Sequence, residues 1–193
     1  MTRVSVIHPS AVLKPSKVEL LKQWLPQQEW FTTDVADLDV LERFRFVDPE
    51  GEVGLEVMLL TVGDDIFQVP LTYRGAPRDD ADDDDLVGLI DHSVLGTRWV
   101  YDGMTDPVFL AELERVIRDA DTSADKQAHG SDEVIPPSID VRGTGVLEGR
   151  DPVGELEVIG LVTDEPYEDA AGRLVAVLGE GAERREVVLA VLR

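Results

Sequence analysis

Apolar and polar positions along the chain form two helical patterns separated by a long region of strand-like patterns. The first helical pattern has apolar residues at positions 18, 21, 24 and 25, which fall on one face of a helix. Ser16 precedes it, and Glu19 follows three residues later, which is the spacing of a capping box. Pro26 ends the pattern because proline cannot continue a helix. A short helix between Ser16 and Pro26 is therefore predicted.

The second helical pattern begins at Asp106-Pro107. Aspartate suits the N-cap of a helix, and proline suits its first position because no N–H is needed there. The apolar stripe that follows consists of Phe109, Leu110, Leu113, Val116 and Ile117. We therefore predict a second helix that buries this stripe in the core.

Strand-like segments lie between the two helices. They are residues 41–47, 53–62, 66–73, 86–90 and 94–101. Short turns rich in Gly, Asp and Pro join the first three segments, which predicts an antiparallel meander. Pro70 cannot donate a hydrogen bond to a neighbouring strand, so we expect the third strand to lie at a sheet edge or to be kinked there.

The pattern changes after the second helix. Residues 120–137 are polar and small and show no period, which is typical of a mobile linker. Strand-like segments then return at residues 139–147, 156–163, 173–178 and 186–192. The predicted fold class is α+β. An antiparallel sheet with two flanking helices occupies residues 1–119, an acidic flexible linker residues 120–137, and a small antiparallel β subdomain residues 138–193.

Composition excludes several classes of partner. The 193 residues carry a formal net charge of −22, which would repel both nucleic-acid backbones and anionic membranes. Such charge favours a highly soluble protein, with an acidic face that docks a basic partner as the alternative. The chain has no cysteine, no apolar run near the roughly 20 residues that span a bilayer, and no signal-peptide pattern. We therefore expect a cytoplasmic protein.

Residue types used in metal sites and in hydrolases occur without the required spacing. The acidic run at residues 79–85 lacks the glycine and the distal glutamate of a calcium-binding loop, so a solvated loop is predicted. His8, His92 and His129 are far apart in the sequence and show no metal-ligand spacing. Residues 91–93 read Asp-His-Ser, but neighbours on a strand point to opposite faces. We therefore predict no metal site and no catalytic residue.

A glycine-containing segment, Gly143 to Gly149, is superficially similar to a phosphate-covering loop. It matches neither a Walker motif nor a dinucleotide fingerprint. No lysine follows Lys126, so no later strand can supply the ammonium that pairs nucleotide phosphates in kinases. A flexible strand with a hairpin is favoured over a nucleotide loop, and no cofactor is predicted.

The candidate ligand or partner surface consists of Tyr73, Arg74, Trp99, Tyr101 and Asp102. Aromatic and polar groups together could stack on a sugar or anchor a partner. Under the alternative, strand alternation turns Trp99 and Tyr101 inward, and both are core residues. Exposure of these two side chains would favour the surface.

Three segments resemble a known family when taken in order. They are Trp24 to Phe31, QVPLTYR at residues 68–74, and WVYDGMTDPVFLAEL at residues 99–113. Over residues 10–118 the chain resembles the N-terminal cap of maltokinase-type sugar kinases, including trehalose synthase–maltokinase fusions. The resemblance implies an antiparallel sheet flanked by helices, with a cystatin-like outline. The C-terminal sheet then resembles a reduced form of the intermediate subdomain that follows the cap.

The resemblance carries no catalytic residue onto this sequence. In such kinases the phosphate-binding lysine and the catalytic and metal-binding aspartates lie outside the cap, and we expect the chain to lack the catalytic lobe. The favoured function is a non-catalytic cap-like binding or regulatory module with a protein partner in α-glucan, trehalose or maltose metabolism. One alternative is a remnant of a kinase N-terminal lobe that binds ATP. The other is a small carbohydrate-binding module that uses Tyr73, Trp99 and Tyr101.

Overall fold

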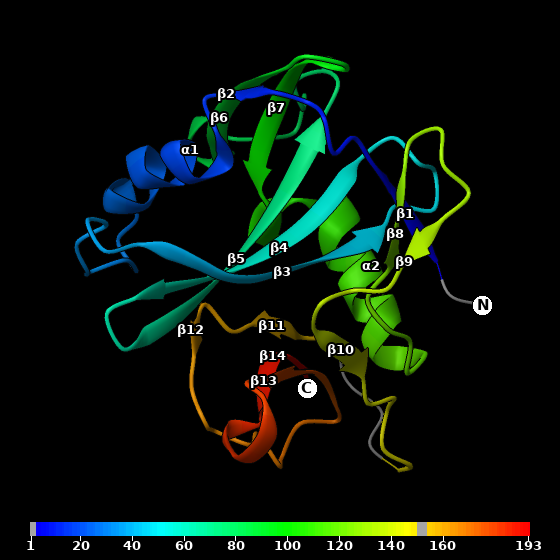
Figure 1. The fold of residues 1–193 in the computed structure, drawn as a ribbon. Coiled ribbons are helices and arrows are strands. Elements are labelled where there is room, and N and C mark those ends of the chain that lie inside the picture. The colour runs from blue at the N-terminus through cyan, green and yellow to red at the C-terminus, as the bar shows by residue number, and fades with distance from the viewer. Residues whose placement is uncertain (1–2, 150–153) are drawn as a thin grey trace.

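The structure is a computed structural model that describes residues 3–149 and 154–193. Strands dominate its architecture. This part of the chain contains two α-helices and three β-sheets (Figure 1). The prediction of two helices combined with antiparallel sheets is therefore confirmed. Residues 150–153 of the predicted C-terminal subdomain lie outside the described residues. Short 3₁₀ turns occur at Leu25–Gln27, Asp83–Asp85, Gly103–Thr105 and Gly181–Glu183. Among the described residues, no helix is long and apolar enough to cross a membrane.

The largest sheet of the described chain has seven strands, and all of its pairs are antiparallel. Its order is β2 (Leu13–Lys14), β6 (Leu86–His92), β7 (Gly96–Asp102), β5 (Asp65–Arg74), β4 (Gly54–Val62) and β3 (Asp39–Val47), with β12 (Leu161–Val162) paired to β5. The predicted meander is confirmed because β3, β4 and β5 are neighbours in chain order.

Both predicted helices form, with the predicted caps. At the start of α1 (Lys17–Trp24), the Ser16 hydroxyl accepts from the Glu19 N–H at 3.2 Å, and the Glu19 carboxylate accepts from the Ser16 N–H at 2.8 Å. At the start of α2 (Pro107–Arg118), the Asp106 carboxylate accepts from the Val108 N–H at 3.0 Å.

The two helices lie against opposite faces of the large sheet. Alternate residues of β4 show this most clearly. Leu55 and Leu59 pack in the cluster that contains the α2 stripe, whereas Met58 and Leu60 pack in the cluster that contains α1. Strands buried on both faces are apolar at successive positions, which explains the nearly continuous apolar run of β4. In Figure 1, α1 lies above the long strands and the C-terminal sheet lies below them.

Of the two alternatives for the strand with Pro70, the edge position is wrong, and a kink at Pro70 stays a prediction. β5 is an internal strand, with β4 along one side from Asp65 to Tyr73. On its other side it pairs with β12 at residues 66–67 and with β7 at residues 71–74. Pro70 therefore occupies the gap between these two partners, where no neighbouring strand needs a backbone donor from residue 70. Gly103 fills the gap, and a Cβ there would lie 2.7 Å from the Cβ of Pro70.

The C-terminal segments form a small antiparallel sheet, as predicted. Its order is β10 (Asp140–Gly143), β13 (Gly172–Leu178), β14 (Arg185–Leu192) and β11 (Leu156–Val158). The predicted segment at 156–163 is two strands, because β12 leaves this sheet and joins β5. Side chains from α2, β3, β4 and this sheet share one hydrophobic cluster.

A third, small sheet joins the N-terminus to residues 120–137. β1 (Val4–Ile7) pairs in parallel with β8 (Asp125–Ala128), and β9 (Val134–Ile135) pairs with β8. The sequence of β8, DKQA, has no apolar alternation, so periodicity does not indicate a strand there. The division of the chain at residues 119 and 137 stays a prediction.

Candidate binding pocket

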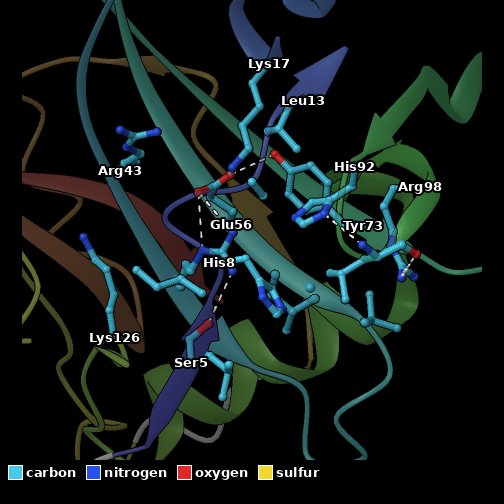
Figure 2. Close-up of a pocket in the computed structure, with 18 of the residues that line it drawn as sticks. Ser5, His8, Leu13, Lys17, Arg43, Glu56, Tyr73, His92, Arg98 and Lys126 are labelled. Atoms are coloured by element: carbon cyan, nitrogen blue, oxygen red, sulfur yellow. Dashed lines mark hydrogen bonds and ion pairs between the residues drawn. The ribbon is translucent and has the colours of Figure 1, made fainter. Parts of the chain in front are cut away.

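A pocket with a volume of ≈ 1030 Å³ lies over the face of the large sheet that carries α1 (Figure 2). Its floor comes from β3, β4 and β5. Its walls come from residues 4–13 and from the start of α1. Arg45 lies opposite Glu56 in the register of β3 and β4, so the two side chains share the pocket face. The sheet thus presents charged side chains where its other positions are apolar.

Glu56 is the centre of the polar floor. It is only 3% exposed, and it forms ion pairs with Lys17 of α1 and with Arg45 of β3. Its Oε2 also accepts a hydrogen bond from the Tyr73 hydroxyl at 2.8 Å. Arg45 in turn donates to the Ser5 hydroxyl at 3.4 Å, which links the floor to β1. A buried carboxylate requires such partners, since an isolated one is costly to desolvate.

This network shifts the pKa values of Glu56, Tyr73 and Lys17. Burial alone would raise the pKa of Glu56, but Lys17, Arg45 and the Tyr73 hydroxyl outweigh it and lower the pKa to about 2. Burial and the neighbouring Glu56 charge raise the pKa of Tyr73 well above its ordinary value. Burial lowers the pKa of Lys17, and attraction to Glu56 opposes that effect. The floor therefore presents an ionised carboxylate and a neutral hydroxyl at neutral pH.

Further cations line the pocket around this network. Arg43, Arg98 and Lys126 all contribute to the lining, and no carboxylate within the described residues forms an ion pair with any of them. Arg98 donates from Nη2 to the Leu95 carbonyl, while its buried Nε has no hydrogen-bond partner within the described residues. The pocket thus holds positive charge that the described carboxylates do not neutralise.

The three histidines come together beside this pocket. The His8 ring stacks on His129 with centroids 4.9 Å apart and lies nearly perpendicular to the His92 ring, with centroids 5.6 Å apart. His92 Nδ1 accepts from two backbone N–H groups in the β6–β7 turn, and burial together with His8 lowers the pKa of His92. Their sequence spacing does not predict this cluster. Within the described residues, no group of three or more His, Cys, Asp or Glu is arranged to hold a metal ion.

The five predicted surface residues do not share one face. Tyr73 lies opposite Val100 in the register of β5 and β7 and faces the pocket. Arg74 and Trp99 form the next pair, so both point to the opposite face. Tyr101 points the same way as Trp99, but it is only 3% exposed and belongs to the interior, whereas Trp99 is half-buried. The role of these five residues as a ligand or partner surface stays a prediction.

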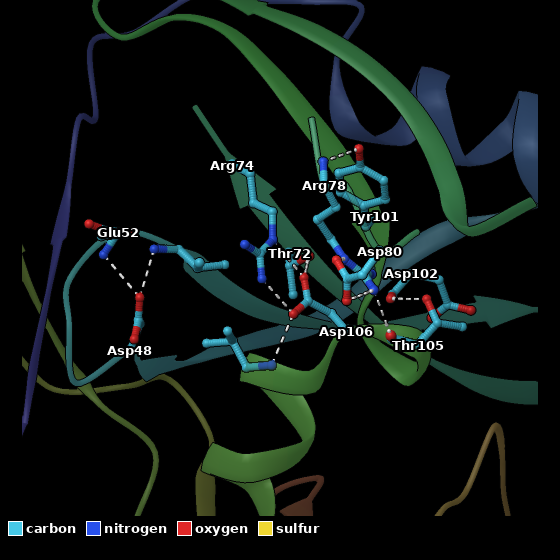
Figure 3. A network of polar contacts seen from close by, with 12 residues as sticks. Asp48, Glu52, Thr72, Arg74, Arg78, Asp80, Tyr101, Asp102, Thr105 and Asp106 are labelled. Carbon is cyan, nitrogen blue, oxygen red and sulfur yellow. Dashed lines mark hydrogen bonds and ion pairs between the residues drawn. The ribbon is translucent and has the colours of Figure 1, made fainter. Parts of the chain in front are cut away.

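Arg74 and Asp102 take part in separate polar contacts near the start of α2 (Figure 3). Arg74 binds Asp106 through two hydrogen bonds, of 2.9 and 2.7 Å, and Thr72 donates to the same carboxylate at 2.7 Å. Asp102 accepts from the Met104 N–H at 2.8 Å, and burial raises the pKa of Asp102 to about 6. These contacts secure the turn between β7 and α2.

Local structure explains two segments for which the sequence analysis disfavoured a metal site or a nucleotide site. In the acidic run, Asp82 and Asp85 form a capping box around a 3₁₀ turn, and Asp80 pairs with Arg78. In the glycine-containing segment, Gly143 lies in β10 against α2. A Cβ at Gly143 would lie 2.0 Å from the Val116 carbonyl oxygen, so this glycine permits close packing.

Sequence reasoning missed the floor residues Lys17, Arg45 and Glu56. One signal was available, because Glu56 interrupts the apolar run GLEVMLLTV of β4. A charged residue inside a buried strand requires partners and so indicates a polar site. Its partners lie 39 and 11 residues away along the chain, so the sequence does not identify them.

In a comparison with known protein families, the model of the maltokinase N-terminal cap domain matches residues 24–106. The matched segment contains β3 to β7, and therefore most of the pocket floor, and it ends at Asp106, the N-cap of α2. This confirms the resemblance drawn from the sequence. No curated protein matches the chain.

Proposed function

We propose that this chain, which carries a maltokinase N-terminal cap-like domain, is a non-catalytic binding or regulatory module in α-glucan, trehalose or maltose metabolism. The family match supports a kinase-related role in carbohydrate metabolism, and the ≈ 1030 Å³ pocket provides a place for a ligand. The proposal includes a cytoplasmic location, a protein partner among the enzymes of that metabolism, and the cystatin-like outline with two flanking helices.

The observation that carries the proposal is the chemistry of the pocket floor. A general acid or base works best when its pKa lies near the working pH. Glu56 has a pKa of about 2 and that of Tyr73 is raised, so neither group exchanges protons readily near neutrality. Both are also held by each other and by the neighbouring cations. Such a floor suits the recognition of a ligand better than proton transfer.

The test combines binding with turnover in one preparation. The purified chain is titrated by calorimetry with maltose, trehalose and Mg²⁺-ATP, and ATP consumption is measured in the presence of each sugar. We expect binding without phosphorylation of sugar. Phosphorylation of maltose by the chain alone would contradict the non-catalytic proposal. The Mg²⁺-ATP titration also tests the alternative of an ATP-binding kinase remnant.

The partner is tested separately with purified enzymes of maltose and trehalose metabolism, each added to the immobilised chain. Saturable binding of one such enzyme to the chain supports the regulatory proposal, provided that the enzyme does not bind an immobilised acidic control protein of similar charge. Absence of binding to every such enzyme would remove the protein-partner part of it.

A second candidate function, a small carbohydrate-binding module, is favoured by a different pocket. This pocket of ≈ 380 Å³ is lined by Trp30, which is 41% exposed, together with Thr32, Thr33 and Asp65. An exposed aromatic ring beside hydroxyl and carboxylate groups suits the stacking and hydrogen bonding of a sugar. Quenching or shift of tryptophan fluorescence by maltose, lost in Trp30→Ala and retained in Trp99→Phe, would establish it. A response unchanged in Trp30→Ala would contradict it.

A further inference from the structure

The charge of the large pocket is opposite to that of the whole chain. Lysine and arginine number 18 against 40 aspartates and glutamates in the sequence. The pocket instead is lined by five cationic and three acidic residues. The cationic residues are Lys17, Arg43, Arg45, Arg98 and Lys126, and the acidic residues are Asp48, Glu52 and Glu56. A concave, partly desolvated surface of one sign concentrates ligands of the other sign.

Two of the three carboxylates are occupied by the fold itself. Asp48 accepts from three backbone N–H groups of the β3–β4 turn, at 2.9 to 3.0 Å. Glu56 is held by Lys17, Arg45 and the Tyr73 hydroxyl. The third, Glu52, is exposed in the same turn. Backbone N–H groups and neighbouring side chains therefore already bind two of the three carboxylates.

Arg43 and Lys126 come from different elements and remain available to bind a ligand. Arg43 is an exposed residue of β3, and Lys126 belongs to β8, which pairs with β1 in the pocket wall. Neither forms an ion pair with a carboxylate within the described residues. Figure 2 shows both side chains on the same side of the drawn pocket, away from His92 and Arg98. A guanidinium and an ammonium on the same side of a pocket are groups that proteins use for phosphate.

We propose that this pocket binds a small molecule that carries a phosphate group, with Arg43 and Lys126 as its phosphate-binding residues. The volume of ≈ 1030 Å³ is at the upper end of small-molecule sites and greatly exceeds that of a bare phosphate ion. Tyr73, His8 and the apolar lining provide contacts for the uncharged part of the ligand. This inference rests on the proposed binding function, because it names the ligand class of the same pocket.

The experiment uses the whole chain and calorimetric titration at low salt with four probes: α-D-glucose 1-phosphate, glucose, inorganic phosphate and maltose. We expect glucose 1-phosphate to bind more tightly than glucose or phosphate alone. Arg43→Gln and Lys126→Gln should each weaken its binding by about tenfold, since hydrogen bonds to charged groups have that order of effect. The control is Lys14→Gln, an exposed lysine of β2 outside the pocket, which should bind like the wild type.

The outcomes separate this inference from the function on which it rests. Equal affinities for glucose and glucose 1-phosphate, or unchanged affinity in both pocket variants, would overturn the phosphate site. If maltose then still bound without turnover, the binding module would stand and only its ligand class would be wrong. Thermal unfolding midpoints of both variants close to that of the wild type would show that any loss of binding is not a loss of folding.

Discussion

The Tyr73 ring lies across Gly54 and places its hydroxyl 2.8 Å from Glu56, two residues farther along the neighbouring strand. Gly54 is the register partner of Tyr73, and a Cβ there would lie 3.3 Å from the Cβ of Tyr73. The small residue therefore allows a diagonal cross-strand contact. Lys17 Nζ lies 4.9 Å from the centroid of the same ring. One aromatic side chain thus joins α1, β4 and β5 at the pocket floor.

Loss of the Tyr73 hydroxyl should destabilise the protein moderately. Tyr73→Phe removes one donor from the buried Glu56 carboxylate, and hydrogen bonds to charged groups contribute about 1.5–3 kcal/mol. We expect a loss of this size in the free energy of unfolding, measured with urea at neutral pH. The control is Tyr167→Phe, which should change stability by less than about 0.5 kcal/mol. Equal effects of the two substitutions would contradict the role assigned to the hydroxyl.

Glu56 should make stability depend on acid pH. The pKa of Glu56 is lowered in the folded protein from 4.5 to about 2. Its contribution is therefore fully present above pH 4.5 and is lost as the pH falls toward 2, which amounts to about 3 kcal/mol. Glu56→Gln leaves Lys17 without its buried partner and should cost about 3–5 kcal/mol at neutral pH.

Urea unfolding of wild type and Glu56→Gln between neutral pH and pH 2 measures this dependence. The difference in unfolding free energy between the two proteins should shrink as the pH falls through the pKa window of Glu56. A difference that stays constant over the whole range would show that Glu56 titrates in the folded state as it does in the unfolded chain.

Asp102 should act in the opposite direction. Burial raises its pKa from 3.8 to about 6, so the folded state disfavours the charged form. This penalty is absent below pH 3.8, grows as the pH rises and is fully present above pH 6, where it reaches up to about 3 kcal/mol. Asp102→Asn keeps an acceptor for the Met104 N–H without the charge. It should therefore stabilise the protein at pH 8 and have little effect near pH 4, as measured by urea unfolding.

Asp106 should be the most sensitive position at the junction between the sheet and α2. Its buried carboxylate binds Thr72 and Arg74 of β5 and caps α2 through the Val108 N–H. Asp106→Ala leaves these donors without a partner and should cost about 3–5 kcal/mol. The exposed turn residue Asp64 offers the control Asp64→Ala, with an expected change below about 0.5 kcal/mol. Equal losses in the two variants by chemical denaturation would exclude the proposed anchoring role.

Local signals predicted both helices and the longer strands, and long-range pairing decided the rest. Ser16, Glu19 and Asp106 specify helix starts through hydrogen bonds within four residues, so the sequence indicates them directly. Pro70 also has a local meaning, but its place in an internal strand depends on the arrival of β12 and β7 from elsewhere in the chain. The edge position predicted from Pro70 was therefore wrong.

The pocket was hidden from the sequence for the same reason. Lys17 and Lys126 look like ordinary surface lysines in the sequence. They reach one pocket only through the packing of α1 and the pairing of β1 with β8. His8 and His129 meet through that same pairing of β1 with β8. Tyr73 was predicted as a candidate residue, and Glu56, a charge within an apolar strand, was the further signal available in the sequence.

Substitution of Gly143 tests whether this glycine permits close packing or belongs to a nucleotide-binding loop. β10 packs against α2 at this residue, and a Cβ would meet the Val116 carbonyl oxygen at 2.0 Å and the Ile117 Cα at 2.7 Å. Because backbone atoms cannot move aside cheaply, Gly143→Ala should cost about 1–3 kcal/mol or more in unfolding free energy. Gly160→Ala is the control, since its Cβ would meet only the Met104 methyl at 3.8 Å, and its effect should be small. If Gly143→Ala instead left stability unchanged and weakened Mg²⁺-ATP binding, the glycine would serve a nucleotide and not the helix.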